Sequence, residues 1–248
     1  MAGRLGNRAR FAIAYLMLGA AVGAGLGALI VLLQRPAPGP PPPWSVWRPG
    51  ATSVLDREVQ IANHVGAAYK LPSGDQLTYV RVGGPANGKS LRAIVIPTTP
   101  KPQTLGDFQT YDWSKSVVYV LCGTGSNCKI GEGDPTKARG TVIRREALEL
   151  ALYTMRYNEI DNVLVFVPPG PKQKKLSSGL FFKRNDLESH LSKPLRTTLP
   201  QGQAPLPGKI ASGEQQTVDQ LTGSNLYTYV GILPANGYGN VLAIQPTG

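Results

Sequence analysis

The chain has 248 residues, enough for one or two folded domains, and its hydrophobic fraction of 42% excludes a chain without a core. Charged residues make up only 17%, and the 29 glycines and 22 prolines indicate many turns and at least one stretch without regular structure. The net charge of +11 would suit a nucleic-acid-binding protein, but the excess gathers at the N-terminus and in one later segment, which argues against that class.

Residues 11–33 form an apolar run without any charge. At about 1.5 Å per residue, a helix of this length covers the roughly 30 Å hydrocarbon core of a bilayer. The run is longer than the apolar region of a cleaved signal peptide, and Gln34-Arg35-Pro36 follows it in place of a cleavage site. The sequence therefore predicts an uncleaved transmembrane helix over 11–33.

The charges that flank this run predict its orientation. Arg4, Arg8 and Arg10 precede it without an acid, and only Arg35 lies close behind it. The positive-inside rule then makes 1–10 a cytoplasmic tail and places the remaining chain outside the cell membrane, as a single-pass protein.

The predicted span carries glycine every four residues, at Gly19, Gly23 and Gly27. Small residues at this spacing let two membrane helices approach closely, so the pattern predicts a helix–helix contact in a homodimer. The alternative is that glycine and alanine are simply common in membrane helices.

Residues 34–52 are expected to form a linker. The stretch PAPGPPPP at 36–43 favours an extended polyproline II spacer, because proline lacks an amide donor and restricts φ. Trp44 and Trp47 follow, and the sequence leaves open whether they lie at the membrane interface or on the folded domain.

The globular domain is predicted over 53–248, as a mixed α/β domain with a central sheet of five or six strands. Within it, GGPANGKS at Gly83–Ser90 matches the phosphate-binding P-loop pattern. A P-loop requires a helix after it, whereas a strand pattern over 91–97 follows here, and Asn87-Gly88 favours a hairpin with the strand at 76–82. We therefore expect no nucleotide binding at this loop.

The remaining elements follow in order along the chain. We expect helices at 54–71, from Asp134-Pro135 to Tyr157, at 181–192 and at 213–221, strands at 116–122 and 162–169, and a closing hairpin of 227–233 with 240–246. Residues 194–210 are expected to be a loop. The strand, helix and strand between 116 and 169 predict a βαβ unit with a parallel pair.

Catalytic motifs are not evident. On the helix that ends at Tyr157, Arg145 and Glu149 are expected to be a solvent-exposed pair, and Glu146 part of the same surface pattern. His64 and His190 are the two histidines, and neither has a motif-level nucleophile beside it. The sequence favours a protein that is not an enzyme, and it predicts no catalytic residue, metal ligand or cofactor.

Cys122 and Cys128 are the two cysteines. Outside the membrane, thiols tend to be oxidised, so a structural disulfide that closes a glycine-rich loop is the favoured interpretation. A redox pair usually shows a C-x-x-C spacing at a helix start, and a metal site needs three or four ligands, so both alternatives are weaker.

The positive charge of the globular domain is concentrated in one segment. Residues 53–248 hold 21 Lys and Arg against 15 acids, and the stretch 170–210 alone holds eight bases and two acids. Its candidate anion-binding residues are Lys172, Lys174, Lys175, Lys183, Arg184, Lys193 and Arg196. Outside the cell the ligand would be a lipid head group or a wall polymer and no nucleic acid; the alternative is a solvated surface.

Several stretches, among them WSVWRPG, RREALELALYTMRY before NVLVFVPP, and FFKRNDLESHLSKPL, resemble a family of uncharacterised single-pass membrane proteins of actinobacteria. The resemblance spans most of the chain. It implies a location in the cell membrane and no particular functional residue.

Three functions are compatible with these patterns. The first is a non-enzymatic, membrane-anchored domain that contacts another component of the cell envelope, such as a protein. The second is a module that binds anionic wall polymer or lipid head groups through 172–196. The third is an envelope enzyme, which would need a deep pocket lined by titratable groups with shifted pKa values.

Overall fold

The computed structural model of the chain describes residues 7–33, 42–83, 90–170, 173, 175–235 and 239–247. The chain divides into two compact units, Met1–Pro42 and Pro43–Gly248, which are described separately below. The first unit contains a continuous helix, α1 (Asn7–Leu33). Among the described residues, no helix is both long and apolar enough to cross a membrane. This finding does not support the transmembrane helix expected over 11–33, which stays a prediction. Most of the proline-rich spacer, at 34–41, lies outside the described residues.

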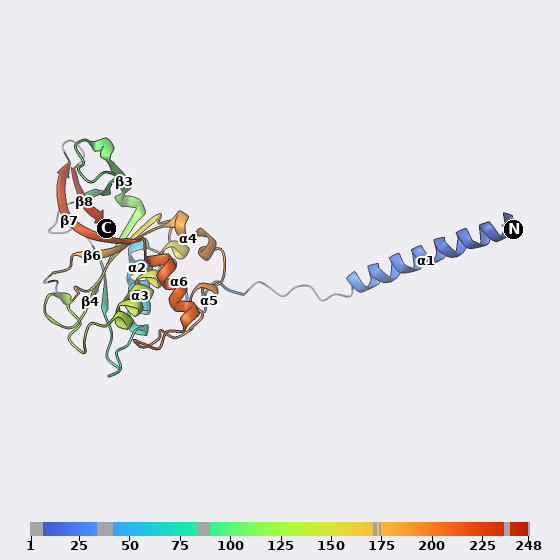
Figure 1. Ribbon diagram of the computed structural model, residues 1–248, viewed down its shortest axis with the longest axis horizontal. Helices are drawn as coiled ribbons and strands as arrows, with labels where there is room; N and C mark the ends of the chain where they lie inside the picture. Colours follow the sequence, from blue (N-terminus) through green and yellow to red (C-terminus); the bar gives the residue numbers. More distant parts are fainter. Residues whose placement is uncertain are drawn as a thin grey trace. The chain divides into compact units, whose positions relative to one another are not determined.

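The second unit is built on a single mixed sheet whose strand order is β1-β4-β5-β6-β7-β8-β2-β3 (Figure 1). Its strands are β1 (Tyr79–Val82), β2 (Leu91–Pro97), β3 (Phe108–Asp112), β4 (Ser116–Cys122), β5 (Asn162–Phe166), β6 (Ser178–Lys183), β7 (Leu226–Ala235) and β8 (Gly239–Pro246). The predicted mixed α/β class is confirmed, with eight strands in place of five or six. Strands β3 and β6 are the two that the sequence did not predict.

The described part of this unit also contains five α-helices: α2 (Val54–Ala68), α3 (Lys137–Tyr157), α4 (Arg184–Leu191), α5 (Leu195–Thr198) and α6 (Ser212–Thr222). Short 3-10 turns lie at Leu105–Asp107, Trp113–Lys115 and Ser126–Cys128. The hydroxyl of Ser53 caps α2 by accepting from the amide of Asp56, and that of Thr136 caps α3 by accepting from the amide of Arg139. Helix α3 therefore begins after Thr136, two residues later than the Asp134-Pro135 pair suggested.

Three local predictions were wrong. The expected loop at 194–210 contains helix α5 (Leu195–Thr198). The expected hairpin of 76–82 with 91–97 does not form, because β1 pairs with β4 at one edge of the sheet while β2 lies between β8 and β3. A strand nevertheless follows the P-loop-like stretch, whose residues 84–89 lie outside the described residues. The expected helix at 181–192 begins at Arg184, because the apolar residues Phe181 and Phe182 end strand β6.

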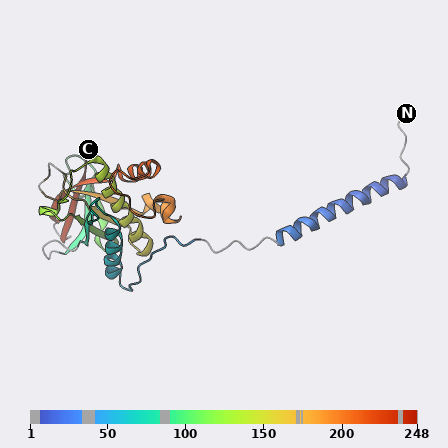
Figure 2. The same ribbon diagram turned by 90° about the horizontal axis from the view of Figure 1, so that it is seen from below.

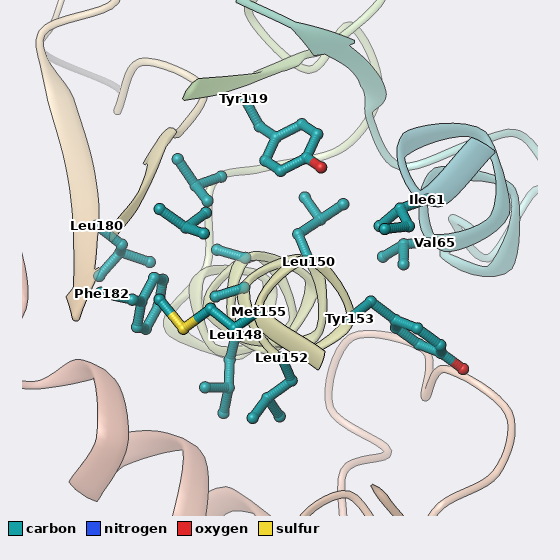
Figure 3. Packing of buried hydrophobic residues seen from close by; sticks show 14 of the residues in the cluster. Ile61, Val65, Tyr119, Leu148, Leu150, Leu152, Tyr153, Met155, Leu180 and Phe182 are labelled. Atoms are coloured by element: carbon teal, nitrogen blue, oxygen red, sulfur yellow. The ribbon is translucent and has the colours of Figure 1, made fainter. Parts of the chain in front are cut away.

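The predicted βαβ unit is confirmed. Strands β4 and β5 run parallel, with Ser116 opposite Asn162 and Val120 opposite Phe166, and α3 connects them. Helix α2 lies beside α3, and α6 packs against α3 as well (Figure 1, Figure 2). Because neighbours surround α3, apolar side chains project from it in several directions, toward Leu180 and Phe182 on one side and Ile61 and Val65 on the other (Figure 3).

The sheet curls over on itself on the side away from the helices. Tyr111 of β3 lies edge-to-face on Phe181 of β6, with ring centroids 4.8 Å apart. These strands are four places apart in the sheet, which would separate them by about 19 Å if the sheet were flat. A second apolar cluster therefore fills the concave side, where Val118, Leu164 and Phe181 meet residues of β2 and β8.

The segment that follows the linker packs onto the globular unit. Trp44 lies edge-to-face against Tyr153 and Tyr157, and its carbonyl accepts from the amide of Leu195 at 2.7 Å. Trp47 stacks on His64 with ring centroids 3.9 Å apart. Of the two positions that the sequence left open for these tryptophans, the structure places both on the folded domain, and the compact unit accordingly begins at Pro43.

The predicted disulfide between Cys122 and Cys128 is confirmed. It closes a short loop in which the amide of Gly123 donates to the carbonyl of Cys128 and that of Gly125 donates to the carbonyl of Lys129. A Cβ on Gly123 would lie 2.3 Å from the Lys129 carbonyl oxygen, so only glycine fits at this crossing.

Replacing both cysteines by serine should lower the free energy of unfolding by about 2 kcal/mol, because the unfolded chain loses the constraint of this short loop. Urea unfolding of the oxidised protein and of the double variant measures the difference. As a control, the two proteins should be equally stable in a dithiol reductant. A double variant as stable as the oxidised protein would contradict a stabilising role.

Candidate functional site: a cationic groove at the carboxyl ends of two parallel strands

A groove of about 580 Å³ lies where β4 and β5 end. Its walls are the loop that follows the disulfide, the first two turns of α3, the residues 167–170 after β5, and single leucines at 180 and 226 from β6 and β7. Ligands of open α/β sheets commonly bind in the crevice outside the carboxyl ends of parallel strands, beside the start of the connecting helix. The groove occupies that place in this fold.

The charges on the groove are all of one sign. The described residues that line it include four cations and no carboxylate; the cations are Lys129, Lys137, Arg139 and Arg144. Arg144 also donates to Asp219 at 2.5 Å, so an acid outside the groove neutralises it. In the described part of the chain the other three form no ion pair. A solvent-filled groove with this lining attracts anions.

Arg139 is the most buried of these cations, with 8% of its surface exposed. Its Nη1 donates to the carbonyls of Glu132 at 2.8 Å and Gly133 at 3.1 Å. Burial lowers the pKa of Arg139, and the nearby Asp134 opposes that effect. Among the described residues, its Nε and Nη2 make no hydrogen bond.

The disulfide loop brings two further residues to the groove. Lys129 and Ile130 follow Cys128 directly, and both line the groove. The bond from the amide of Gly125 to the Lys129 carbonyl, at 2.8 Å, holds this turn against the end of β4. Asn127 and Cys128 adopt left-handed backbone conformations, with φ of 55° and 62°. A compact, cross-linked turn therefore positions Lys129 without the need for a long flexible loop.

The residues that the sequence singled out as anion-binding are dispersed. Lys172 and Lys174 lie outside the described residues. Arg184 donates to the carbonyls of Met155, Asn158 and Ile160, and so caps the end of α3. The structure separates Lys175, before β6, from Lys183 at its far end, where Lys183 pairs with Asp186 at 3.2 Å. Lys193 and Arg196 are exposed near α4 and α5.

Both histidines have structural surroundings. His64 stacks on Trp47, and burial lowers its pKa. Nδ1 of His190 lies 2.9 Å from the hydroxyl of Thr198, and burial together with Lys193 lowers its pKa. Within the described part of the chain, no group of three or more His, Cys, Asp or Glu side chains is arranged to hold a metal ion.

The expectation of a solvent-exposed Arg145–Glu149 pair was wrong. Arg145 is 2% exposed and contacts four groups: Nε donates to Glu214 at 2.5 Å, Nη1 to Glu149 at 2.9 Å and to the Tyr69 hydroxyl, and Nη2 to the Gln201 carbonyl at 2.8 Å. The expected pair forms, but α6 and the chain around Gln201 cover it. A single arginine thus joins α3, α6, the end of α2 and the segment before α6.

Two further carboxyl groups are buried on the same side of the sheet. Burial raises the pKa of Glu146 well above its usual value, and its Oε1 accepts from the hydroxyl of Thr78 at 2.7 Å. Burial also raises the pKa of Glu58 to about 7, against the opposing effect of Arg57. Neither residue lines the groove, so these perturbed carboxyl groups do not form a catalytic pair with its cations.

Comparison of the chain with protein-family models, curated proteins and solved structures found no match. The resemblance to actinobacterial membrane proteins gains no support from these comparisons and stays an expectation.

Sequence reasoning missed the groove cations. Lys129, Lys137 and Arg139 are spread over eleven positions that contain two acids, Glu132 and Asp134, so they do not stand out as a basic cluster. The available signal was positional: Lys129 follows a strand and its cysteine pair, and Lys137 and Arg139 begin the helix of a βαβ unit. Combined with the rule for ligands of parallel sheets, that placement would have pointed to this edge.

Replacing Arg145 by methionine should lower the free energy of unfolding by about 3–5 kcal/mol, because Glu214 then remains buried without its cation. The adjacent substitution Arg144→Met is the matched control. It breaks a partly exposed pair with Asp219 and should cost at most about 1 kcal/mol. Urea unfolding measures both, and similar losses would contradict the assignment.

Proposed function

We propose that this chain is a membrane-anchored, non-enzymatic binding protein whose extracytoplasmic domain binds an anionic component of the cell envelope in the groove at the ends of β4 and β5. The observation that carries the proposal is the groove lining, in which four cations occur without a carboxylate. The ligand chemistry is that of the second sequence hypothesis, but the binding residues are Lys129, Lys137 and Arg139 in place of segment 172–196.

Three features support anion binding over general surface charge. The groove has a volume of about 580 Å³, which lies within the range of small-molecule sites. Arg139 is held in place by two carbonyl contacts and keeps donors unpaired among the described residues, so little side-chain freedom is lost on binding. The start of α3 adds the positive end of its helix dipole on the same side.

The anchor and the compartment rest on the sequence. The uncharged run at 11–33 lies within a helix that continues from Asn7 to Leu33, and the arginines before it favour a cytoplasmic N-terminus. The disulfide supports an oxidising compartment for the globular unit. On α1, an added Cβ at Gly19, Gly23 or Gly27 would meet nothing within 4 Å, so no described side chain of α1 covers these glycines. A homodimer through this glycine face stays a prediction.

A second candidate function is contact with an envelope protein, the first of the sequence hypotheses. Strand β1 is an edge of the sheet, and a groove of about 420 Å³ lies between it and α2. Leu55 and Val59 on this groove and Tyr79 on β1 are exposed apolar side chains. Exposed apolar residues beside an unpaired strand edge favour strand addition by a partner.

Anion binding is tested with tripolyphosphate as the probe and the full chain in nanodiscs of neutral lipid. Lys137→Glu should weaken binding by about tenfold, since the substitution reverses a charge on the groove, and the affinity of the unsubstituted protein should fall as salt rises. Glutamate is well tolerated in the first turn of a helix, so α3 should persist.

The matched control for this substitution is Lys115→Glu, which makes the same change in net charge at the opposite end of β4. It should leave the affinity for tripolyphosphate within about twofold of that of the unsubstituted protein, because Lys115 lies more than a Debye length from the groove. Equal losses in both variants would show that the probe responds to net charge alone and would overturn the groove as the site.

The anchor is tested by alkaline extraction of membranes from cells that produce the full chain. The protein should stay in the membrane fraction, and the double variant Val22→Arg and Leu26→Arg should be released, because each charge at the centre of a span costs about 2.5–3.5 kcal/mol. Release of the unsubstituted chain would contradict the proposed anchor.

A further inference from the structure

The cationic groove also has a large apolar surface that an inorganic anion would leave uncovered. Its apolar lining residues are Ile130, Ile143, Val167, Leu180 and Leu226, together with Pro135, Pro168 and Pro169. Leu226 is 37% exposed, and Ile130, Ile143 and Val167 are partly exposed, whereas Leu180 is fully buried beneath them. Partly exposed apolar side chains gathered in one concavity favour a ligand with an apolar part.

The first two turns of α3 present both kinds of side chain to the groove. Lys137, Gly140 and Arg144 are spaced at three and four residues, so they share one helix face, with Ile143 beside them. Lys137 and Ile143 lie about 9 Å apart along the helix axis. The cation thus stands at the start of the helix, and the apolar surface begins within two turns of it.

Gly140 leaves room on this face. It lines the groove, and a Cβ built on it would meet nothing within 4 Å. The helical backbone is therefore open to the groove at this point, between Lys137 and Ile143, and a ligand chain can lie directly against α3.

We propose that the groove binds an amphiphile with a single anionic head group, a phosphate monoester or a carboxylate, and an unbranched or prenyl-like hydrocarbon chain. The head group meets Lys137 and Arg139, and the chain lies over Gly140 and Ile143 toward Val167 and Leu226. This inference rests on the proposed function and specifies its ligand class. A polyanion without an apolar part would use the cations and leave the apolar lining in water.

The test compares three probes on the full chain in nanodiscs of neutral lipid, with empty nanodiscs subtracted: ethyl phosphate, octyl phosphate below its micellar concentration, and octanol. Octyl phosphate should bind at least about tenfold more tightly than ethyl phosphate, since burial of two of its six additional methylenes is enough for that factor. It should also bind at least about tenfold more tightly than octanol, which lacks the head group.

The outcomes separate this inference from the proposed function. Equal affinities for the two phosphates would overturn the amphiphile and leave anion binding intact. Equal affinities for octyl phosphate and octanol would overturn anion binding itself, as would the absence of binding by either phosphate. If octyl phosphate binds, its affinity is measured again in nanodiscs that contain phosphatidic acid. A lower affinity indicates that the lipid competes for the groove, and hence that a membrane lipid is the ligand source. An unchanged affinity indicates a free amphiphile, and either result supports the ligand class.

Two glycine variants locate the hydrocarbon chain. Gly140→Leu places a side chain in the groove, where an added Cβ meets nothing within 4 Å, and should remove the tenfold advantage of octyl phosphate over ethyl phosphate. Gly213→Leu places the same side chain on α6, where an added Cβ also meets nothing within 4 Å, and should leave that advantage unchanged. Both substitutions favour the helical state, so both variants should fold. An advantage retained in Gly140→Leu would overturn the proposed position of the chain.

Discussion

The buried guanidinium of Arg145 is the constraint on which the arrangement of the helices depends. It is enclosed between α3, α6, Tyr69 and the Gln201 carbonyl, and its hydrogen bonds leave these elements little freedom to move independently. Removing a charge from water is costly unless excellent partners surround it, so the site tolerates few alternative arrangements. Glu214 contributes further, because its second oxygen accepts from the amide of Gln201 at 3.0 Å. One ionic network therefore sets where α6 and the preceding segment lie on α3.

Helix α3 carries this constraint to the groove. Its middle is enclosed by α2, α6 and the sheet, so its first two turns project from a rigid support (Figure 3). The opposite wall, after β5, is anchored by the parallel pairing with β4, and Lys129 directly follows the turn that the disulfide closes. Each wall of the groove is thus attached to a fixed element, which reduces the conformational entropy lost when a ligand binds. The walls of the proposed binding site are thus positioned by the scaffold itself.

Burial within the fold accounts for the perturbed carboxyl groups of this protein. Burial raises the pKa values of Glu58, Glu146 and Glu149, a pattern that is often found in active sites. Glu149 belongs to the Arg145 network, and Glu146 is paired with the Thr78 hydroxyl while its other oxygen has no partner among the described residues. A carboxyl group in such surroundings is stable in its protonated form, which needs no cation. These residues lie between α2, α3 and the sheet, and the groove with its cations is elsewhere.

Local patterns were sufficient for the features that depend on near neighbours in the chain. The disulfide, the βαβ unit, the closing hairpin and the strand after the P-loop-like stretch all follow from spacing and periodicity over short distances. The order of the strands could not be predicted in the same way. Locally, β1 and β2 look like a hairpin, yet β1 pairs with β4, with Val82 opposite Tyr119, and β2 pairs with β8, with Val95 opposite Ala243. The burial of Arg145 was equally hidden, since a 3.6-residue period cannot show that a second helix covers the polar face. The tertiary structure alone dispersed the basic segment and brought Lys129, Lys137 and Arg139 to one groove, because only the folded sheet aligns the ends of β4 and β5 with the start of α3.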